Sequence, residues 1–258
     1  MTVTITFANR KGGVGKTTSA VTLADGLARQ GQRVLLVDLD SQGHAGLALG
    51  TPKGDALYRW LVQGEDLGSV STIARPNLSL VAGGSQNELV NTHLQKQKQG
   101  LKLLWKLASR MVGVDVLVLD TPPGMCPLQD AALIACDLLV IPVVMEKLAL
   151  ISLDETLHSV AELRKEHPRA AQFGIRILPT LFERTAQEQK HNFQQLADAY
   201  GTILWPPIPR DARVREAQAQ AKTLWEAAPG TAAIQYNMNG KRVGGYQPIQ
   251  ERILEMIT

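Results

Sequence analysis

The residues best suited to chemistry form a glycine-rich stretch near the N-terminus, Lys11-Gly12-Gly13-Val14-Gly15-Lys16-Thr17-Thr18. Before it, residues 3–8 are apolar and β-branched, which predicts a strand, and after it residues 17–30 repeat alanine and leucine at helical spacing. A glycine-rich turn between a strand and a helix is typical of a phosphate-binding loop. Its backbone N–H groups can point at a polyphosphate, and the helix start adds its positive dipole end. A purely structural glycine turn is the alternative.

Three side chains of this loop have predicted roles. Lys16 would reach the β- and γ-phosphates of a nucleotide, and the Thr17 hydroxyl would bind Mg²⁺. Lys11 stands where the general pattern has glycine, and its side chain starts on the wrong side of the loop to serve the same nucleotide. It can therefore be offered to a neighbouring molecule, or it is an ordinary solvated lysine. The other expected nucleotide contacts in the loop are Gly12, Gly13, Val14, Gly15 and Thr18.

Three aspartates end predicted buried strands, at the edge where an open α/β sheet builds its site. Asp120 suits the role of holding the water shell of Mg²⁺. Asp38 and Asp40 are two residues apart and would share a face of a straight strand, so one can orient the attacking water while the other supports it or Mg²⁺. Phosphoryl transfer needs mainly such positioning, plus positive charge on the γ-phosphate. Helix caps or solvated strand ends are the alternative interpretation.

The elements that position these residues alternate between strand and helix. Strands are predicted at 33–40, 78–81, 114–120, 138–144, 176–179 and 201–204. Helices are predicted at 56–62, 86–112, 128–136, 152–167, 187–200, 214–221 and 248–257. Such alternation favours an α/β fold, a doubly wound, mostly parallel sheet flanked by helices, within one domain over residues 1–258.

Composition limits the function classes further. The net charge of +3 neither requires nor excludes a nucleic-acid partner. No apolar run approaches the roughly 20 residues of a membrane span, and the N-terminus lacks a signal-peptide pattern, so we expect a cytoplasmic protein. The two cysteines, Cys126 and Cys136, match no metal spacing and are best interpreted as small core residues.

Several motifs resemble the ParA/MinD family of deviant Walker A P-loop ATPases, in the small form without an N-terminal helix-turn-helix. They are Asn9-Arg10 with the loop itself, and residues 37–43, 120–124 and 208–217. The resemblance implies a P-loop NTPase fold and an ATP-dependent sandwich homodimer in which Lys11 crosses to the phosphates of the partner. It also implies that Asp40 activates water with support from Asp38, and that Pro209 and Arg210 border the adenine. Residues 229–247 depart from the usual pattern, being long and glycine-rich.

Three functions compete. The first is a nucleoid-associated ATPase with slow basal turnover that binds DNA non-specifically and positions a plasmid, a chromosomal locus or an organelle such as the carboxysome. An adaptor, ParB-like or dedicated to organelle positioning, would stimulate hydrolysis. Expected DNA contacts, all away from the phosphate loop, are Arg184, Arg213, Arg215 and Lys222. The second is a MinD-type membrane switch, which the two glutamates and one arginine of the tail disfavour. The third, a metabolic enzyme such as an amidating synthetase, lacks an obvious second-substrate constellation.

Overall fold

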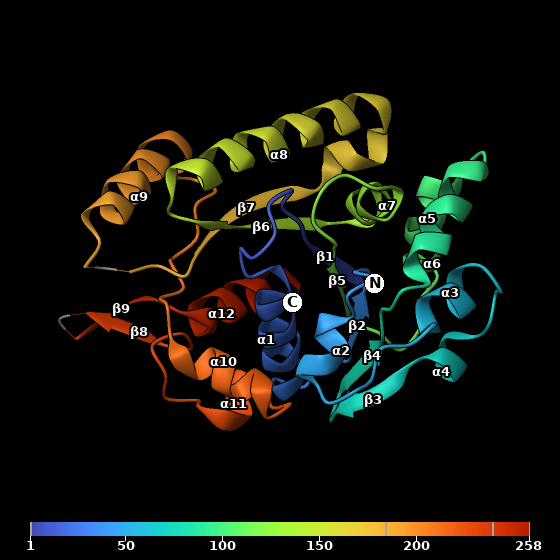
Figure 1. The fold of residues 1–258 in the computed structure, drawn as a ribbon, viewed down its shortest axis with the longest axis horizontal. Helices are drawn as coiled ribbons and strands as arrows, with labels where there is room; N and C mark the ends of the chain where they lie inside the picture. Colours follow the sequence, from blue (N-terminus) through green and yellow to red (C-terminus); the bar gives the residue numbers. More distant parts are fainter. Residues whose placement is uncertain (1, 184, 239, 258) are drawn as a thin grey trace.

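The computed structural model describes residues 2–183, 185–238 and 240–257. Within them, a seven-stranded sheet has the order β3-β4-β2-β5-β1-β6-β7, and every neighbouring pair except β3 and β4 is parallel. Its strands are β1 (Val3–Phe7), β2 (Val34–Asp38), β3 (Thr72–Arg75), β4 (Leu78–Val81), β5 (Val116–Asp120), β6 (Leu138–Val144) and β7 (Gly174–Thr180). The predicted α/β fold with a mostly parallel sheet is confirmed (Figure 1).

Helices cover both faces of this sheet. Their bounds are α1 (Lys16–Arg29), α2 (His44–Ala48), α3 (Ala56–Leu61), α4 (Leu67–Val70), α5 (Asn87–Lys96), η1 (Gly100–Lys102), α6 (Leu103–Ala108), α7 (Pro127–Ala135), α8 (Lys147–Glu166), η2 (Pro168–Gln172), α9 (Gln187–Tyr200), α10 (Ala212–Ala219), α11 (Leu224–Ala227) and α12 (Tyr246–Ile257). Figure 1 shows α1, α10, α11 and α12 on one face and α7, α8 and α9 on the other.

The side chains of each central strand point alternately into the hydrophobic cores on the two faces of the sheet. In β2, Leu36 points into the core shared with α1 and α12, while Val37 points into the core shared with α5 and α7. Val118 and Leu119 of β5 divide in the same way. A strand that is buried on both faces has no polar face to expose, which accounts for the uninterrupted apolar runs in the sequence.

Two predicted elements are wrong. The single helix over 86–112 is three pieces, α5, η1 and α6, because the chain folds back after Lys96. A Cβ on Gly100 would lie 2.0 Å from the carbonyl oxygen of Leu94, so this close return requires glycine. The predicted strand at 201–204 is a turn that forms one isolated bridge, between Leu204 and Ile177 of β7.

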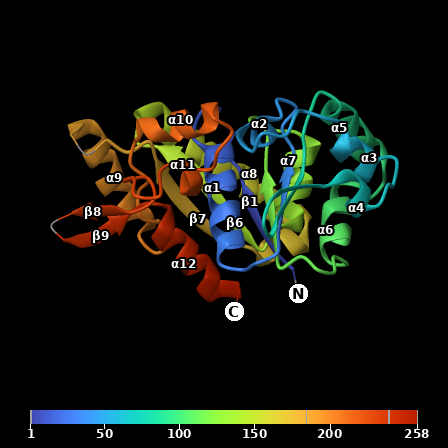
Figure 2. The ribbon, with the colours of Figure 1, turned by 90° about the horizontal axis from the view of Figure 1, so that it is seen from below.

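The C-terminal segment packs onto α1. Tyr246, Ile249 and Ile253 of α12 are buried in the core with α1. The unassigned segment 229–247 contains an antiparallel hairpin, β8 (Tyr236–Met238) and β9 (Lys241–Gly244), which projects at the same end of the molecule as α9 (Figures 1 and 2). In the described part of the chain, no helix is both long and apolar enough to cross a membrane.

Candidate nucleotide site

The loop between β1 and α1 has the backbone of a phosphate cradle. Gly13 and Gly15 have φ angles of 74° and 85°, in the left-handed region that favours glycine. Added Cβ atoms would meet nothing closer than the Thr180 side chain at 3.7 Å, so backbone conformation and not crowding requires these glycines. Helix α1 begins at Lys16 and has no acidic residue in its first turn. Its free N–H groups and dipole are therefore available to an anion.

Hydrogen bonds from three other elements hold the loop. The buried Asn9 donates to the carbonyl of Pro142 in β6 at 2.7 Å and accepts from the backbone N–H of Lys11 at 2.9 Å. Ser152 of α8 donates to the same Asn9 side chain. On the other side, the Thr180 hydroxyl at the end of β7 donates to the Val14 carbonyl at 2.8 Å. The loop is thus braced before any nucleotide binds.

The two lysines of the loop point to different places. Lys16 is buried, and its Nζ donates to the carbonyls of Asn9 at 3.1 Å and Lys11 at 3.0 Å. Burial lowers the pKa of Lys16, against the opposing effect of the Asp120 and Asp40 carboxylates. Lys11 is partly exposed, and its Nζ lies 3.5 Å from Oε2 of Glu146 at the start of α8. Lys16 lines the cavity described below, whereas Lys11 does not.

The predicted acids converge but differ in access. Asp38 is fully buried, and its two oxygens accept from the backbone N–H groups of Asp40 at 3.0 Å and Ala45 at 2.9 Å. Burial raises the pKa of Asp38 to about 7. Asp40 lies beyond the strand, lines the cavity and accepts from the backbone N–H of Gln42. The assumption of a straight strand through both residues is therefore wrong, because β2 ends at Asp38.

Asp120 ends β5 with both carboxylate oxygens buried and without hydrogen-bond partners among the described residues. Burial, with Asp38 close by, raises the pKa of Asp120 well above its usual range, and the charge of Lys16 offsets this only in part. A carboxylate left without protein donors beside a threonine hydroxyl is a set of oxygen ligands that suits a hydrated Mg²⁺. The residues present therefore fit the expected metal.

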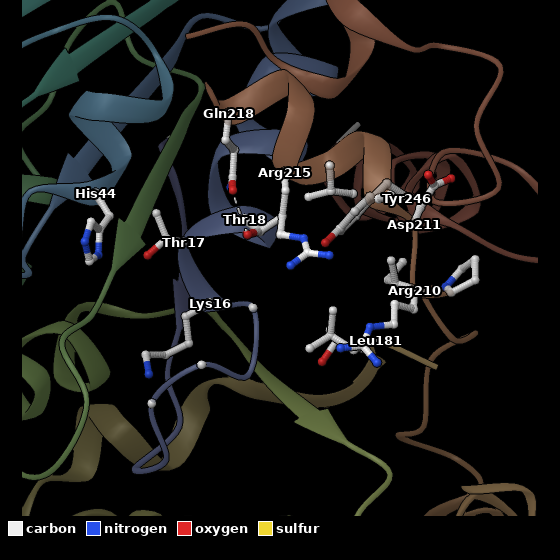
Figure 3. A pocket seen from close by; sticks show the side chains of 18 of the residues that line it. Lys16, Thr17, Thr18, His44, Leu181, Arg210, Asp211, Arg215, Gln218 and Tyr246 are labelled. Carbon is white, nitrogen blue, oxygen red and sulfur yellow. Dashed lines mark hydrogen bonds between the residues drawn. The ribbon is translucent and has the colours of Figure 1, made fainter. Parts of the chain in front are cut away.

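A cavity of about 750 Å³ opens above the loop, which is large enough for a nucleotide. Gly12, Gly13, Asp40 and Pro123 line one part of it. Leu181, Ile208, Pro209 and Arg210 line another part, the predicted adenine side (Figure 3). Arg210 forms an ion pair with Glu183.

Helix α10 forms a further wall of the cavity, which the sequence motifs did not predict. Arg215 points from α10 into the cavity beside Thr18, and Gln218 donates to the Thr18 hydroxyl at 3.1 Å (Figure 3). Tyr246 of α12 also lines the cavity, and its hydroxyl lies 3.0 Å from the Ser19 hydroxyl. The spacing of Arg215 and Gln218, one turn apart on a predicted helix, was the available signal, whereas Tyr246 had none.

The four expected DNA contacts are not equivalent. Arg213 is exposed and paired with Asp211 at 3.0 Å, and Lys222 is exposed just beyond the end of α10. Arg184 lies outside the described residues. The expectation that all four lie away from the phosphate loop is wrong for Arg215, because α10 packs beside the start of α1. A DNA-binding role for these residues stays a prediction.

Comparison with known proteins agrees with this geometry. A family model described as an AAA domain matches residues 2–173. The chromosome-partitioning ATPase Soj of Thermus thermophilus is 37% identical over 227 residues, which cover 87% of this chain and 88% of Soj. The chain belongs to the ParA/Soj family of P-loop ATPases. It is accordingly an ATP hydrolase.

Solved structures of similar fold carry the expected ligands. McdA of Cyanothece in complex with ATP has a TM-score of 0.79 at 23% identity, covering 88% of this chain and 90% of McdA. Cobyrinic acid a,c-diamide synthase of Mycobacterium smegmatis, with ADP and magnesium bound, has a TM-score of 0.74 at 26% identity, covering 86% and 93% of the two chains. Together with the family, these neighbours support ATP and Mg²⁺ as the ligands of this ParA-type ATPase.

Proposed function

We propose that this ATPase is a positioning switch that dimerises when it binds ATP and then binds DNA without sequence preference. It would segregate or position a cargo, a plasmid, a chromosomal locus or a protein organelle, and an adaptor protein would stimulate hydrolysis. The name of the Thermus relative, a chromosome-partitioning ATPase, supports this assignment. Residues 1–258 would act as one domain, in the cytoplasm and on the nucleoid.

The observation that carries the proposal is the divergence of the two loop lysines. Lys16 already lies inside its own cavity, whereas Lys11 lies outside it and pairs with Glu146 across a partly exposed 3.5 Å contact. Exposed ion pairs of this kind contribute little, about 0–1 kcal/mol, so Lys11 can exchange its partner at low cost. A phosphate bound by a second copy of the chain should attract Lys11 more strongly than Glu146 does, since charge-assisted contacts to phosphate are among the strongest hydrogen bonds.

Within one subunit, the other side chains of the site have separate roles in hydrolysis. Lys16 neutralises charge on the β- and γ-phosphates, and Asp40, which reaches the cavity, orients the attacking water. Asp38 positions Asp40 through the hydrogen bond to its backbone N–H. Thr17 and Asp120, with Asp38 nearby, would hold Mg²⁺, which supplies further positive charge to the phosphates. Basal turnover should be slow, because a positioning switch must keep its state until the adaptor arrives.

Light scattering with and without a non-hydrolysable ATP analogue tests the dimer. Wild-type protein should be monomeric alone and dimeric with the analogue, while Lys11→Ala should keep nucleotide affinity and stay monomeric. Lys165→Ala, which removes an exposed lysine of α8, is the matched control and should dimerise normally. Dimers of Lys11→Ala as stable as those of the wild type would refute the cross-subunit role.

Titration of random duplex DNA at several salt concentrations tests the DNA step. Arg213 and Lys222 are exposed and basic, so each substitution by alanine should weaken binding and lower the salt slope by about one unit. Binding should require ATP and show no sequence preference. Equal binding with ADP, or strong preference for one sequence, would contradict the proposal.

Two alternatives remain as outcomes of such tests. A MinD-type membrane switch needs a free amphipathic helix, but the apolar residues Ile249 and Ile253 of α12 are buried against α1. Co-sedimentation of the protein with anionic liposomes in the presence of ATP would support the membrane switch. An amidating synthetase is the other alternative, which the similarity to the mycobacterial diamide synthase supports. A nucleotide-dependent amidation of a small acid by the purified protein would establish it.

A further inference from the structure

Arg215 differs from its neighbouring arginines in having no acidic partner. Arg210 pairs with Glu183 and Arg213 pairs with Asp211, but no ion pair is found for Arg215 within residues 2–183, 185–238 and 240–257. Its side chain nevertheless points into the nucleotide cavity (Figure 3). A guanidinium directed into a cavity without a counter-charge is suited to an anionic ligand, and it matches phosphate geometry in particular.

The position of Arg215 along the cavity indicates which phosphate it meets. Lys16 and Thr17 belong to the β- and γ-phosphates, and Pro209 and Arg210 lie on the predicted adenine side. Arg215 lies between these two groups, beside Thr18 (Figure 3). In a nucleotide that spans this cavity, the atoms between the adenine and the β-phosphate are the ribose and the α-phosphate. Of these, only the α-phosphate carries charge.

Gln218 adds an independent contact at the same place. It lies one turn after Arg215, on the same side of α10, and its Nε2 donates to the Thr18 Oγ1 at 3.1 Å. Because the Thr18 oxygen accepts this bond, its hydroxyl proton is directed away from Gln218. The hydroxyl can then donate to an anion in the cavity.

We propose that Arg215 and Gln218 form a second phosphate-binding wall of the ATP site, in which Arg215 binds the α-phosphate and Gln218 positions the Thr18 hydroxyl toward it. Arg215 then serves the nucleotide and not DNA. Nucleotide binding follows from the family, so this inference does not depend on the DNA or cargo steps.

Equilibrium binding of three ligands to Arg215→Ala tests the first half of the inference. The ligands are AMP, which has the α-phosphate alone, 2′-deoxy-ADP and a non-hydrolysable ATP analogue. All three contain the α-phosphate, so each should bind about tenfold more weakly, by the same factor. Arg215→Lys should recover part of the loss. Arg252→Ala removes an exposed arginine of α12 that does not line this cavity, and it should leave all three affinities unchanged.

Each other outcome has a distinct meaning. A loss confined to the ATP analogue would assign Arg215 to the γ-phosphate, and a loss that spares 2′-deoxy-ADP would assign it to the ribose. Unchanged affinity for all three nucleotides, together with weaker binding of duplex DNA, would indicate that Arg215 contacts DNA. Any of these results overturns the inference. Because Arg215 is exposed, its variants should fold, which thermal melting verifies.

A double-mutant cycle tests the positioning role of Gln218. Gln218→Ala should weaken ADP binding a few-fold in the wild type, and it should cause no further loss in Thr18→Val, where the hydroxyl that it orients is absent. Gln220→Ala, an exposed glutamine just after α10, is the matched control. Additive losses in the cycle would mean that Gln218 acts only through the packing of α10 and would overturn this half of the inference.

Discussion

The two sides of the nucleotide cavity are built in different ways. On the phosphate-loop side, Asn9, Thr180 and Ser152 bind backbone or buried polar atoms, and the loop they hold follows directly from a central strand of the sheet. On the α10 side, a hydrogen bond between two side chains, from Gln218 to Thr18, joins the helix to the start of α1. Arg215 reaches the cavity from an exposed helix without an acidic partner among the described residues.

This difference indicates that the two sides of the cavity have different roles in hydrolysis and in nucleotide binding. A loop fixed by buried hydrogen bonds presents its N–H groups in one geometry, which electrostatic stabilisation of a reacting phosphate requires. A wall joined by a side-chain hydrogen bond can shift at low cost and adjust to the ligand. We therefore expect substitutions on the loop side to abolish turnover and substitutions on the α10 side to alter nucleotide affinity.

The largest effect is expected for Lys16→Ala. Lys16 is buried between the loop carbonyls and the carboxylates of Asp40 and Asp120, where it would neutralise charge on the β- and γ-phosphates. Turnover should fall by roughly 10²–10³-fold or more, the loss typical of a charge-stabilising donor. Phosphate release under saturating ATP measures it, with Lys165→Ala as the control. Turnover within tenfold of the wild-type rate would contradict the expected difference between the loop side and the α10 side of the cavity.

Separate substitutions of Asp38, the last residue of β2, and of Asp40, just beyond it, should distinguish a catalytic role from a stabilising one. Asp40→Ala should bind ATP and fold normally but hydrolyse about a hundredfold more slowly, as expected for the loss of a water-orienting base. Asp38→Asn should also lower the free energy of unfolding by about 1–3 kcal/mol, since an amide cannot accept from both the Asp40 and Ala45 N–H groups. Chemical denaturation and phosphate release together measure the contrast. A stable, active Asp38→Asn protein would contradict it.

The same contrast explains what the sequence could predict. The loop, the aspartates and six of the seven sheet strands follow from local patterns, because glycine spacing and apolar runs can be recognised without knowledge of distant contacts. Helix α10 was also predicted to within two residues at each end. The side of α10 that faces the cavity was not, because it depends on how α10 packs against α1, about 200 positions earlier in the sequence.

Three other segments also differ between the prediction from sequence and the structure. Of the predicted strand 201–204, only Leu204 forms a bridge to β7. The following residues touch β7 only at separate points, since the N–H groups of Trp205 and Ile208 donate to the carbonyls of Ile177 and Pro179. The antiparallel edge strand β3 is partly exposed and therefore lacks the apolar run of the central strands. The hairpin of β8 and β9 did have a local signal, since Asn239-Gly240 is a favoured hairpin turn in sequence.

A brace of the loop should have a smaller effect than its catalytic groups. Thr180→Val keeps the shape of a buried side chain but removes the donor to the Val14 carbonyl, which should cost about 1–3 kcal/mol of stability. Nucleotide affinity should fall with it, because the loop loses one of its supports. Thr180→Ser restores the hydroxyl and should restore affinity. If Thr180→Val binds ATP as the wild type does, the loop does not need this brace.

The smallest effect is expected at the start of α10. Asp211 caps this helix by accepting from the backbone N–H of Arg213 at 3.1 Å, and it pairs with the Arg213 side chain. Asp211→Ala should cost about 1 kcal/mol of stability, the usual cost of a lost cap. Since α10 carries Arg215, ADP should bind roughly fivefold more weakly at most. Turnover at saturating ATP should stay near the wild-type rate, in contrast to Lys16→Ala.

Comparison of Asp211→Asn with the wild type separates the charge of Asp211 from its capping, because asparagine also caps helices. Burial raises the pKa of Asp211, but the side chain and N–H of Arg213 outweigh it and hold the pKa below its usual value of 3.8. The carboxylate therefore stabilises the fold above about pH 4, and this contribution is lost as the pH falls through the folded-state pKa. The difference in unfolding free energy between wild type and Asp211→Asn should shrink in that range. A difference that is constant from pH 7 to pH 3 would show that the charge of Asp211 does not support α10.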